Sequence, residues 1–308
     1  MYISVIVATR DRAASLAALL ESAGKLQPGD GLEWELIVVD NGSRDTTPAL
    51  LEAWSGRAGL PLTALTEATP GKPLALNHAL TVARGDVIAF TDDDCLLPAS
   101  WLDDIRAVFD ADPALDGFGG RVELHDAGDA ALTTRSGRER VLLTSPRRQF
   151  TLLIGCNMAL RRACLDALGH FDPLVGPGAP VGSGNDADVV YRAFRAGYRL
   201  SYEPGVVVYH HHGRRSEPDI AALRQRYLRG RGGFYYKFIR RGDGLALRMA
   251  AAELSKLLRR MVAAALRGGE TATYRQDLAW LLAGFADRRR AEHAQAQAER
   301  DSGGGVRS

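Results

Sequence analysis

Long hydrophobic runs and paired cysteines are both missing from this 308-residue sequence. No stretch of about 18 consecutive apolar residues occurs, so the sequence predicts no membrane-spanning helix. The opening residues, MYISVIVATRDR, lack the basic segment, long apolar stretch and cleavage site of a signal peptide, which favours a buried strand. The three cysteines, Cys95, Cys156 and Cys164, form no CxxC pair, which argues against a disulfide framework and a structural zinc site. We therefore expect a protein of the reducing cytoplasm.

A glycine-rich phosphate-binding loop is also missing. Dinucleotide-binding oxidoreductases place such a loop directly after the first strand, where this sequence reads ATRDR. A P-loop enzyme is disfavoured as well, because Gly71-Lys72 is followed by Pro73 and position 66 holds no glycine. These absences argue against two large classes of nucleotide-binding enzymes.

Charge is unevenly distributed along the chain, although the net charge is only +2. Residues 217–308 carry 18 Lys and Arg against 10 Asp and Glu, so residues 1–216 are acidic overall. An acidic first part suits a carboxylate-lined cation site. A basic second part suits an anionic partner such as a membrane surface, although a solvated helical face explains the same surplus. We expect no nucleic-acid partner.

Short apolar, β-branched runs alternate with helical patterns over the first hundred residues. Strands are predicted at 2–8, 35–39, 62–65 and 87–91, and this alternation predicts an α/β fold with a mostly parallel sheet flanked by helices. Later strands are predicted at 200–202 and 206–209, and helices broken by glycines follow from residue 220. Ligands of such sheets bind beyond the carboxyl ends of the strands. Three loops fall there, at residues 9–12, 40–43 and 92–94.

Three consecutive aspartates, Asp92, Asp93 and Asp94, follow the strand at 87–91. Adjacent carboxylates repel one another, and a divalent cation relieves that repulsion. Mg²⁺ and Mn²⁺ both prefer carboxylate oxygen, and such a metal can neutralise substrate phosphates. A solvated acidic turn that caps the next helix is the alternative, but the position at the sheet edge favours a cation site.

Asp40 and Lys72 can each be interpreted as a ligand-binding residue or as a residue with a purely structural or surface role. Asp40 ends the second strand, where a carboxylate can accept hydrogen bonds from a base or a ribose, or simply cap the following turn. Lys72 lies in a turn between two prolines and can meet a phosphate as a point charge, although a surface lysine is the commoner situation.

The segment NDAD at 185–188 follows a glycine-rich stretch and opens a helix. A carboxylate there, Asp186, can act as a general base on a mobile lid, or cap the helix. Three histidines end the strand at 206–209, and strand alternation places His210 and His212 on one side. Imidazole binds metal ions and carries protons, which makes this cluster a second candidate for chemistry.

Seven segments, in this order, resemble the inverting nucleotide-sugar glycosyltransferases of family 2, which have the GT-A fold. They are ISVIVATRDR, IVVDNGSRDTT, PGKPLALNHAL, FTDDDCLLPASWL, GCNMALRR, NDADVVYRAFRAGYRL and the terminal HHH. The resemblance covers residues 2–215. It implies a GT-A type sheet and transfer of a sugar from a nucleoside-diphosphate sugar, a UDP-sugar above all, with GDP and dTDP donors left open.

The resemblance also implies roles for single residues. Asp94 and His210 match metal-binding positions, and Asp186 matches the catalytic base. Relatives often have Glu before that base where this chain has Asn185, so Asp188 remains an alternative base. Gly155 and Cys156 lie, with Asn157, where relatives meet the donor sugar or acceptor. The residues expected at the nucleotide sugar are Ala8, Thr9, Arg12, Asp40, Lys72, Asn77, Asp92, Asp93 and Asn157.

We expect a catalytic domain at 1–216, a helical region at 217–300 and a flexible tail at 301–308. The acceptor is open: a glycan, a lipid-linked molecule or a small molecule. Residues 245–266 have basic and apolar residues at helical spacing, which suits packing on the chain's own domain, a homodimer seam or peripheral contact with the inner face of a membrane. Two other functions remain: a sugar nucleotidylyltransferase, and a non-catalytic scaffold that binds sugar nucleotide or membrane.

Overall fold

The computed structural model describes residues 1–57, 59–145 and 152–303. The chain divides into two compact units. Unit 1 contains Met1–Asp172 and Asn185–Ile220, and unit 2 contains Pro173–Gly184 and Ala221–Ser308. The glycine-rich stretch before residue 185, which the sequence places beside a helix of the first domain, therefore groups with the C-terminal helices.

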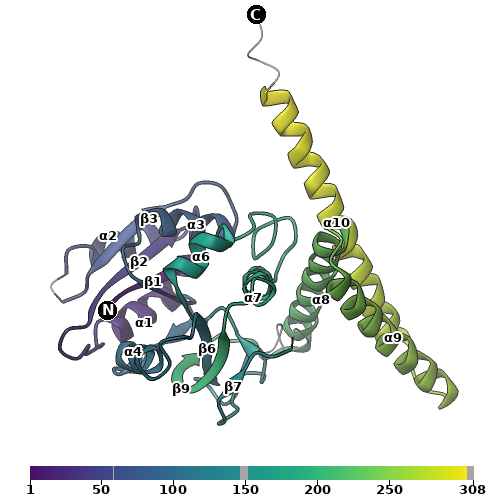
Figure 1. The fold of residues 1–308 in the computed structure, drawn as a ribbon, viewed down its shortest axis with the longest axis horizontal. Coiled ribbons are helices and arrows are strands. Elements are labelled where there is room, and N and C mark those ends of the chain that lie inside the picture. The colour runs from purple at the N-terminus through teal and green to yellow at the C-terminus, as the bar shows by residue number, and fades with distance from the viewer. Residues whose placement is uncertain (58, 146–151, 304–308) are drawn as a thin grey trace, which may run out of the picture. The chain divides into compact units, whose positions relative to one another are not determined.

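Unit 1 is built on a sheet that has nine strands within the described residues (Figure 1). The strands are β1 (Tyr2–Thr9), β2 (Glu33–Asp40), β3 (Leu62–Thr66), β4 (Val87–Thr91), β5 (Cys95–Leu96), β6 (Gly117–Leu124), β7 (Val141–Leu142), β8 (Asn157–Arg161) and β9 (Leu200–His210). Their order is β3-β2-β1-β4-β8-β6-β9-β5, and β7 pairs with β9. Strands β1 to β4 are mutually parallel, whereas β8 runs antiparallel to β4 and β6.

Helices cover both faces of this sheet. On one face lie α1 (Ala13–Ala23), α2 (Thr47–Trp54) and α4 (Trp101–Ala111), and on the other α3 (Lys72–Val82), α6 (Arg162–Leu168) and α7 (Asn185–Arg195). Alternation along β1 divides its side chains between the two cores: Val5 and Val7 pack with α1, and Ile6 packs with α3. Strands buried on both faces read as continuous apolar runs, which is why the sequence identified them. The predicted α/β fold with helices flanking a mostly parallel sheet is confirmed.

Strand β9 is one continuous strand rather than the two short strands that the sequence predicts. Its pairing with β6 shifts register between Gly120 and Arg121, which are paired with Glu203 and Val207. Pro204 lies in the skipped segment and has no N–H to donate to the ladder. The irregular pairing keeps the strand continuous while the proline stays outside the hydrogen-bond pattern.

Three helices dominate the C-terminal part of the chain: α8 (Glu217–Arg240), α9 (Gly244–Leu266) and α10 (Ala272–Gly303). Glycines with positive φ, Gly242 and Gly268, follow the ends of α8 and α9, as the sequence predicts. Helix α10 continues into the segment expected to be a flexible tail, because its Ala, Gln, Glu and Arg residues are strong helix formers. Residues 304–308 of that tail lie outside the described residues.

The glycines inside α8 do not break it, contrary to the sequence-based prediction. A Cβ on Gly232 would lie 1.9 Å from the Leu281 carbonyl oxygen of α10, and one on Gly284 would lie 1.9 Å from the Arg229 carbonyl oxygen. The absent side chains let the two helix backbones approach closely. This close packing offsets the lower helix propensity of glycine.

The glycine-rich segment of unit 2 packs on the same helix. The Ser183 hydroxyl donates a hydrogen bond to the Arg226 carbonyl over 3.0 Å. A Cβ on Gly230 would lie 2.6 Å from the Ser183 carbonyl oxygen, so this contact also requires glycine. Across the described parts of the chain, no helix combines the length and the apolar character needed to span a bilayer.

Candidate functional site

The candidate site lies at the carboxyl edge of the parallel strands. Thr9 ends β1 and pairs in register with Asp40, which ends β2, while Thr91 ends the neighbouring β4. The chain segments after these residues therefore leave the sheet side by side. Local sequence explains each strand, and their adjacency brings the predicted loops at 9–12, 40–43 and 92–94 to one place.

Asp93 points back toward the end of β1. The Thr9 hydroxyl donates to one carboxylate oxygen over 2.7 Å, and Arg12 Nε lies 3.0 Å from the other. Burial raises the pKa of Asp93 to about 6, and the positive charge of Arg12 opposes that rise. Asp93 therefore links the triplet to the first predicted nucleotide-binding loop.

Asp94 lies between two cationic groups. Its Oδ2 is 2.7 Å from Arg12 Nη2, and its Oδ1 is 3.1 Å from His210 Nε2. Burial would raise the pKa of Asp94, but the hydrogen bond and charge of His210 lower it below the ordinary value. Burial would likewise lower the pKa of His210, yet the bond to Asp94 raises it. The two residues predicted to bind metal are thus brought together from distant parts of the chain.

Asp92 forms an ion pair with Lys72, at the start of α3. Burial alone would lower the pKa of Lys72, but the adjacent Asp92 raises it well above the ordinary value, so the ammonium group stays charged. Gly71, immediately before it, has φ of 143°, a conformation that favours glycine. The predicted lysine and the first aspartate of the triplet therefore meet at the same edge.

Asp40 and its neighbour organise the adjacent turns. Asp40 Oδ1 accepts a hydrogen bond from the Ser43 backbone over 2.9 Å, so it caps the turn after β2. The Asn41 side-chain oxygen accepts from the Gly71 backbone over 2.7 Å and so fixes the turn that carries Lys72. Sequence reasoning did not assign Asn41 this role, because its partner is 30 residues away.

Asp186 lies in the first turn of α7. Its Oδ2 accepts from the Gly155 backbone over 3.0 Å, and its Oδ1 accepts from the Ala187 backbone over 2.8 Å. The negative charge of Asp186 adds, after Asp92 and Asp93, to the raised pKa of Lys72. Asp188, the alternative base, is 1% exposed and bonded to Arg192 over 2.8 Å. The burial and ion pair of Asp188 favour a structural role for it.

Two residues predicted to bind the nucleotide sugar have side chains that form hydrogen bonds within the protein itself. The Asn77 carboxamide exchanges two hydrogen bonds of 2.9 Å with the Phe171 backbone. Asn157 is 1% exposed; its amide nitrogen donates to the Arg121 carbonyl, and its oxygen accepts from the Trp101 indole. Both side chains therefore support the fold of unit 1 through bonds to distant parts of the chain. Ala8, by contrast, is half-buried at the carboxyl end of β1.

One cluster within the described residues has donors suited to a metal ion: Asp94, Cys95 and His210 each offer a ligand atom, all within 4.8 Å of one another. Carboxylate oxygen and imidazole nitrogen suit Mn²⁺, whereas the thiol of Cys95 is a softer ligand. His210 Nδ1 is buried and has no hydrogen-bond partner among the residues that the structure describes, so that nitrogen is available as well. The donors of Asp94 and His210 therefore fit a divalent cation, and Cys95 is a neighbour that the sequence did not indicate.

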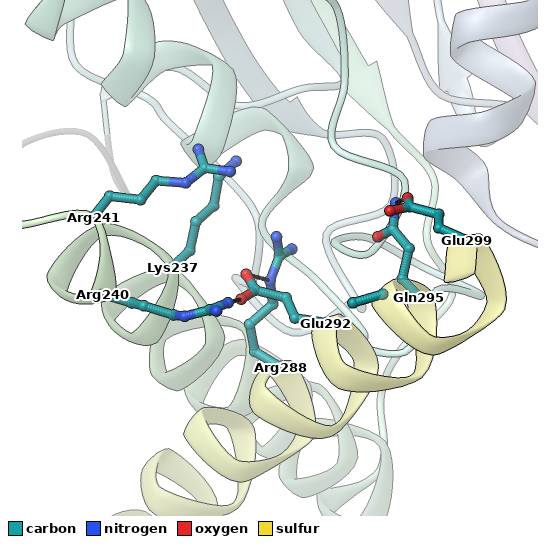
Figure 2. Close-up of a pocket in the computed structure, with 8 residues that line it drawn as sticks. Lys237, Arg240, Arg241, Arg288, Glu292, Gln295 and Glu299 are labelled. Carbon is teal, nitrogen blue, oxygen red and sulfur yellow. Dashed lines mark hydrogen bonds and ion pairs between the residues drawn. The ribbon is translucent and has the colours of Figure 1, made fainter. Parts of the chain in front are cut away.

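A separate cleft of about 470 Å³ lies in unit 2, between α8 and α10 (Figure 2). Glu292 of α10 forms an ion pair with Arg240 of α8 and another with Arg288 on its own helix. Lys237 of α8 and Arg241, which directly follows the last residue of α8, also line the cleft (Figure 2). The cleft lacks the acidic cluster and the strand ends that define the site in unit 1, and we assign no reaction to it.

Comparison with known proteins places these features in a family. Residues 4–169 match the model of glycosyl transferase family 2. Glucosyl-3-phosphoglycerate synthase of Mycolicibacterium paratuberculosis is 33% identical over 151 residues, which span 47% of this chain and only 45% of the synthase. Glycosyltransferase AglE of Haloferax volcanii is 24% identical over 233 residues, which span 75% of this chain and 72% of the AglE chain.

Solved structures show the same fold. Mannosyltransferase PcManGT from Pyrobaculum calidifontis, in complex with GDP-Man and Mn²⁺, superposes with a TM-score of 0.62 at 24% identity. The superposition covers 93% of this chain and 86% of the PcManGT chain. TarS residues 1–349 of S. aureus superpose with a TM-score of 0.56 at 22% identity, over 73% and 64% of the two chains. Since the family model matches more than half of the sequence and the sheet has the same fold, this chain belongs to glycosyl transferase family 2.

Proposed function

We propose that this protein transfers a sugar from a nucleoside-diphosphate sugar to an acceptor hydroxyl, with inversion at the sugar carbon. One observation carries the proposal: Asp92, Asp93 and Asp94 lie at the carboxyl edge of the sheet with Arg12, Lys72 and His210 against them. Acidic groups that can hold a cation stand there beside cationic groups that can meet phosphate. Family membership supports the same reaction class.

The donor would lie across the ends of β1 and β2. Ala8, Thr9 and Asp40 stand where a nucleoside would bind, and Arg12 and Lys72 offer positive charge to the two phosphates. One solved TarS structure of 26% identity and TM-score 0.53 is a complex with UDP-GlcNAc, and the PcManGT complex holds GDP-Man. We favour a UDP-sugar as the donor here.

Asp94 and His210 are the residues that would hold Mn²⁺ or Mg²⁺. A divalent cation bound there would neutralise the negative charge on the departing diphosphate. The burial of both side chains, 6% and 3% exposed, would shield their charges from water and strengthen their interactions with a ligand. Arg12 would keep Asp94 oriented through its second oxygen.

Asp186 is the proposed general base. It would accept the proton of the acceptor hydroxyl as that oxygen forms its bond to the sugar carbon and the diphosphate leaves. The two backbone N–H groups of Gly155 and Ala187 orient its carboxylate. One direct displacement inverts the configuration, so no protein nucleophile is needed.

The reaction is tested by incubating the purified protein with a panel of nucleotide sugars, with and without Mn²⁺. Release of a nucleoside diphosphate supports sugar transfer, whereas pyrophosphate would show a nucleotidylyltransferase. Binding of a donor without turnover across a panel of glycan, lipid-linked and small-molecule acceptors would support a non-catalytic scaffold.

The metal site is tested by Asp94→Ala. We expect the donor dissociation constant, measured by calorimetry, to tighten with Mn²⁺ in the wild type and to be independent of Mn²⁺ in the variant. The physical reason is that the substitution removes the carboxylate of the proposed cation site. Asp110→Ala, at an exposed position of α4, is the matched control and should keep the Mn²⁺ response. An unchanged Mn²⁺ response in Asp94→Ala would contradict the assignment.

A further inference from the structure

Helix α9 exposes a row of large apolar side chains. Val262 is 54% exposed and Leu266 is 84% exposed. The first two residues of this row are seven positions apart and each later one follows after four, so all of them lie along one face of the helix. This row, which we name the α9 stripe, consists of Leu247, Leu254, Leu258, Val262 and Leu266.

The residues around the α9 stripe are strongly basic. The one acidic residue of α9, Glu253, already binds Arg231 and the Tyr235 hydroxyl within unit 2. Arg248 follows Leu247, and Arg259 follows Leu258, so guanidinium groups border the apolar row. The basic residues of α9 and of the position after it are Arg248, Lys256, Arg259, Arg260 and Arg267.

We propose that the α9 stripe is a docking surface for an anionic lipid membrane. Helices with an exposed apolar row and bordering Lys and Arg lie in the membrane interface: the apolar side chains enter the acyl boundary and the cations meet anionic headgroups. Long basic side chains can place their methylene groups on the apolar layer while their charges stay at the headgroups. The helix would thus lie flat on the surface rather than cross it.

The basic residues beside the α9 stripe favour a membrane over a second copy of the chain as its partner. A symmetric dimer would place the same face of α9 against itself, and its basic border would then meet an identical basic border. Like charges at close range oppose such an interface, whereas an anionic bilayer attracts them. Membrane binding by α9 concerns the location of the protein, so it can be tested independently of the proposed transfer reaction.

Flotation of the full chain with vesicles tests the proposal. We expect the protein to float with vesicles that contain phosphatidylglycerol and not with phosphatidylcholine vesicles. Leu258→Ser combined with Val262→Ser should lower the bound fraction more than tenfold, because both side chains are exposed in solution and their replacement leaves the fold intact. Leu282→Ser, on α10 and 59% exposed, is the matched control and should bind normally.

A second pair of variants tests the electrostatic part. Arg248→Gln with Arg259→Gln should weaken binding to anionic vesicles several-fold, whereas Lys25→Gln with Arg138→Gln, which removes two exposed positive charges from unit 1, should not. Vesicle binding that is equal in the stripe variant and the wild type overturns the proposal. A dimer in light scattering that dissociates in the stripe variant, without flotation of the wild type, also overturns it and assigns the stripe to a second copy.

Discussion

Replacing Asp186 by Asn separates catalysis from binding in the proposed reaction. The substitution removes the proton acceptor but preserves the shape of the side chain. General-base catalysis contributes about 100- to 10,000-fold to a rate, or about 3–5 kcal/mol of transition-state stabilisation. We therefore expect turnover at saturating donor and acceptor to fall within that range, while the donor dissociation constant changes by only a few-fold.

The structural cost of Asp186→Asn is small by comparison. The carboxamide oxygen can still accept from one of the two backbone N–H groups, of Gly155 and Ala187, and the other bond is lost. A lost hydrogen bond at a half-buried position costs about 1 kcal/mol of stability. Thermal unfolding should therefore show a slightly lower midpoint, too small to explain the loss of turnover.

Asp188→Asn is the matched control for the same helix turn. It leaves Arg192 without the charge of its buried partner, and breaking a buried ion pair costs about 3 kcal/mol or more. This variant should unfold at clearly lower temperature but retain turnover while folded. Equal losses of turnover and donor affinity in Asp186→Asn would refute the base assignment. Retained turnover there, with inactive folded Asp188→Asn, would move the role to Asp188.

Two further predictions test the surroundings of the site and the fold. In Gly155→Ala the new Cβ would lie 3.2 Å from Asp186 Cβ and 3.3 Å from its Oδ2, so the carboxylate must shift, and we expect about tenfold lower turnover with unchanged donor affinity by calorimetry. Burial opposes ionisation of Glu35, but hydrogen bonds from Ser4 and Arg84 lower its pKa below 4.5, so its stabilisation is present above pH 4.5 and lost as pH falls through the folded-state pKa. Glu35→Gln should lower stability by about 2 kcal/mol at neutral pH, and denaturant titrations should show the difference shrinking in acid; a constant difference would contradict this.

Local chemistry was sufficient to predict much of the sheet and of its loops. Strands such as β1 and β4 are short β-branched runs because both of their faces are buried, and that pattern is visible without any partner. Asp92, Asp93 and Asp94 are adjacent in sequence, so their mutual repulsion could be inferred directly. Their position at the sheet edge followed from the end of β4.

Glycine was the residue type that local reasoning misjudged. The sequence predicts breaks where glycines interrupt a helical pattern, because glycine has low helix propensity. Gly232 instead lies inside α8 because another helix backbone occupies the space of its side chain. Only the packing partner distinguishes a helix end from a close helix contact.

The residues capable of chemistry can be identified from their side chains alone, whereas the contacts among them follow from the folded arrangement of the sheet. Asp94 and His210 are 116 residues apart, and no periodicity links them; the pairing of β5 with β9 brings them to 3.1 Å. Asn41 likewise holds the Lys72 turn through a partner 30 residues away in sequence. Strand order depends on the burial of whole faces rather than on any single motif, which is why these contacts emerge only once the sheet is assembled.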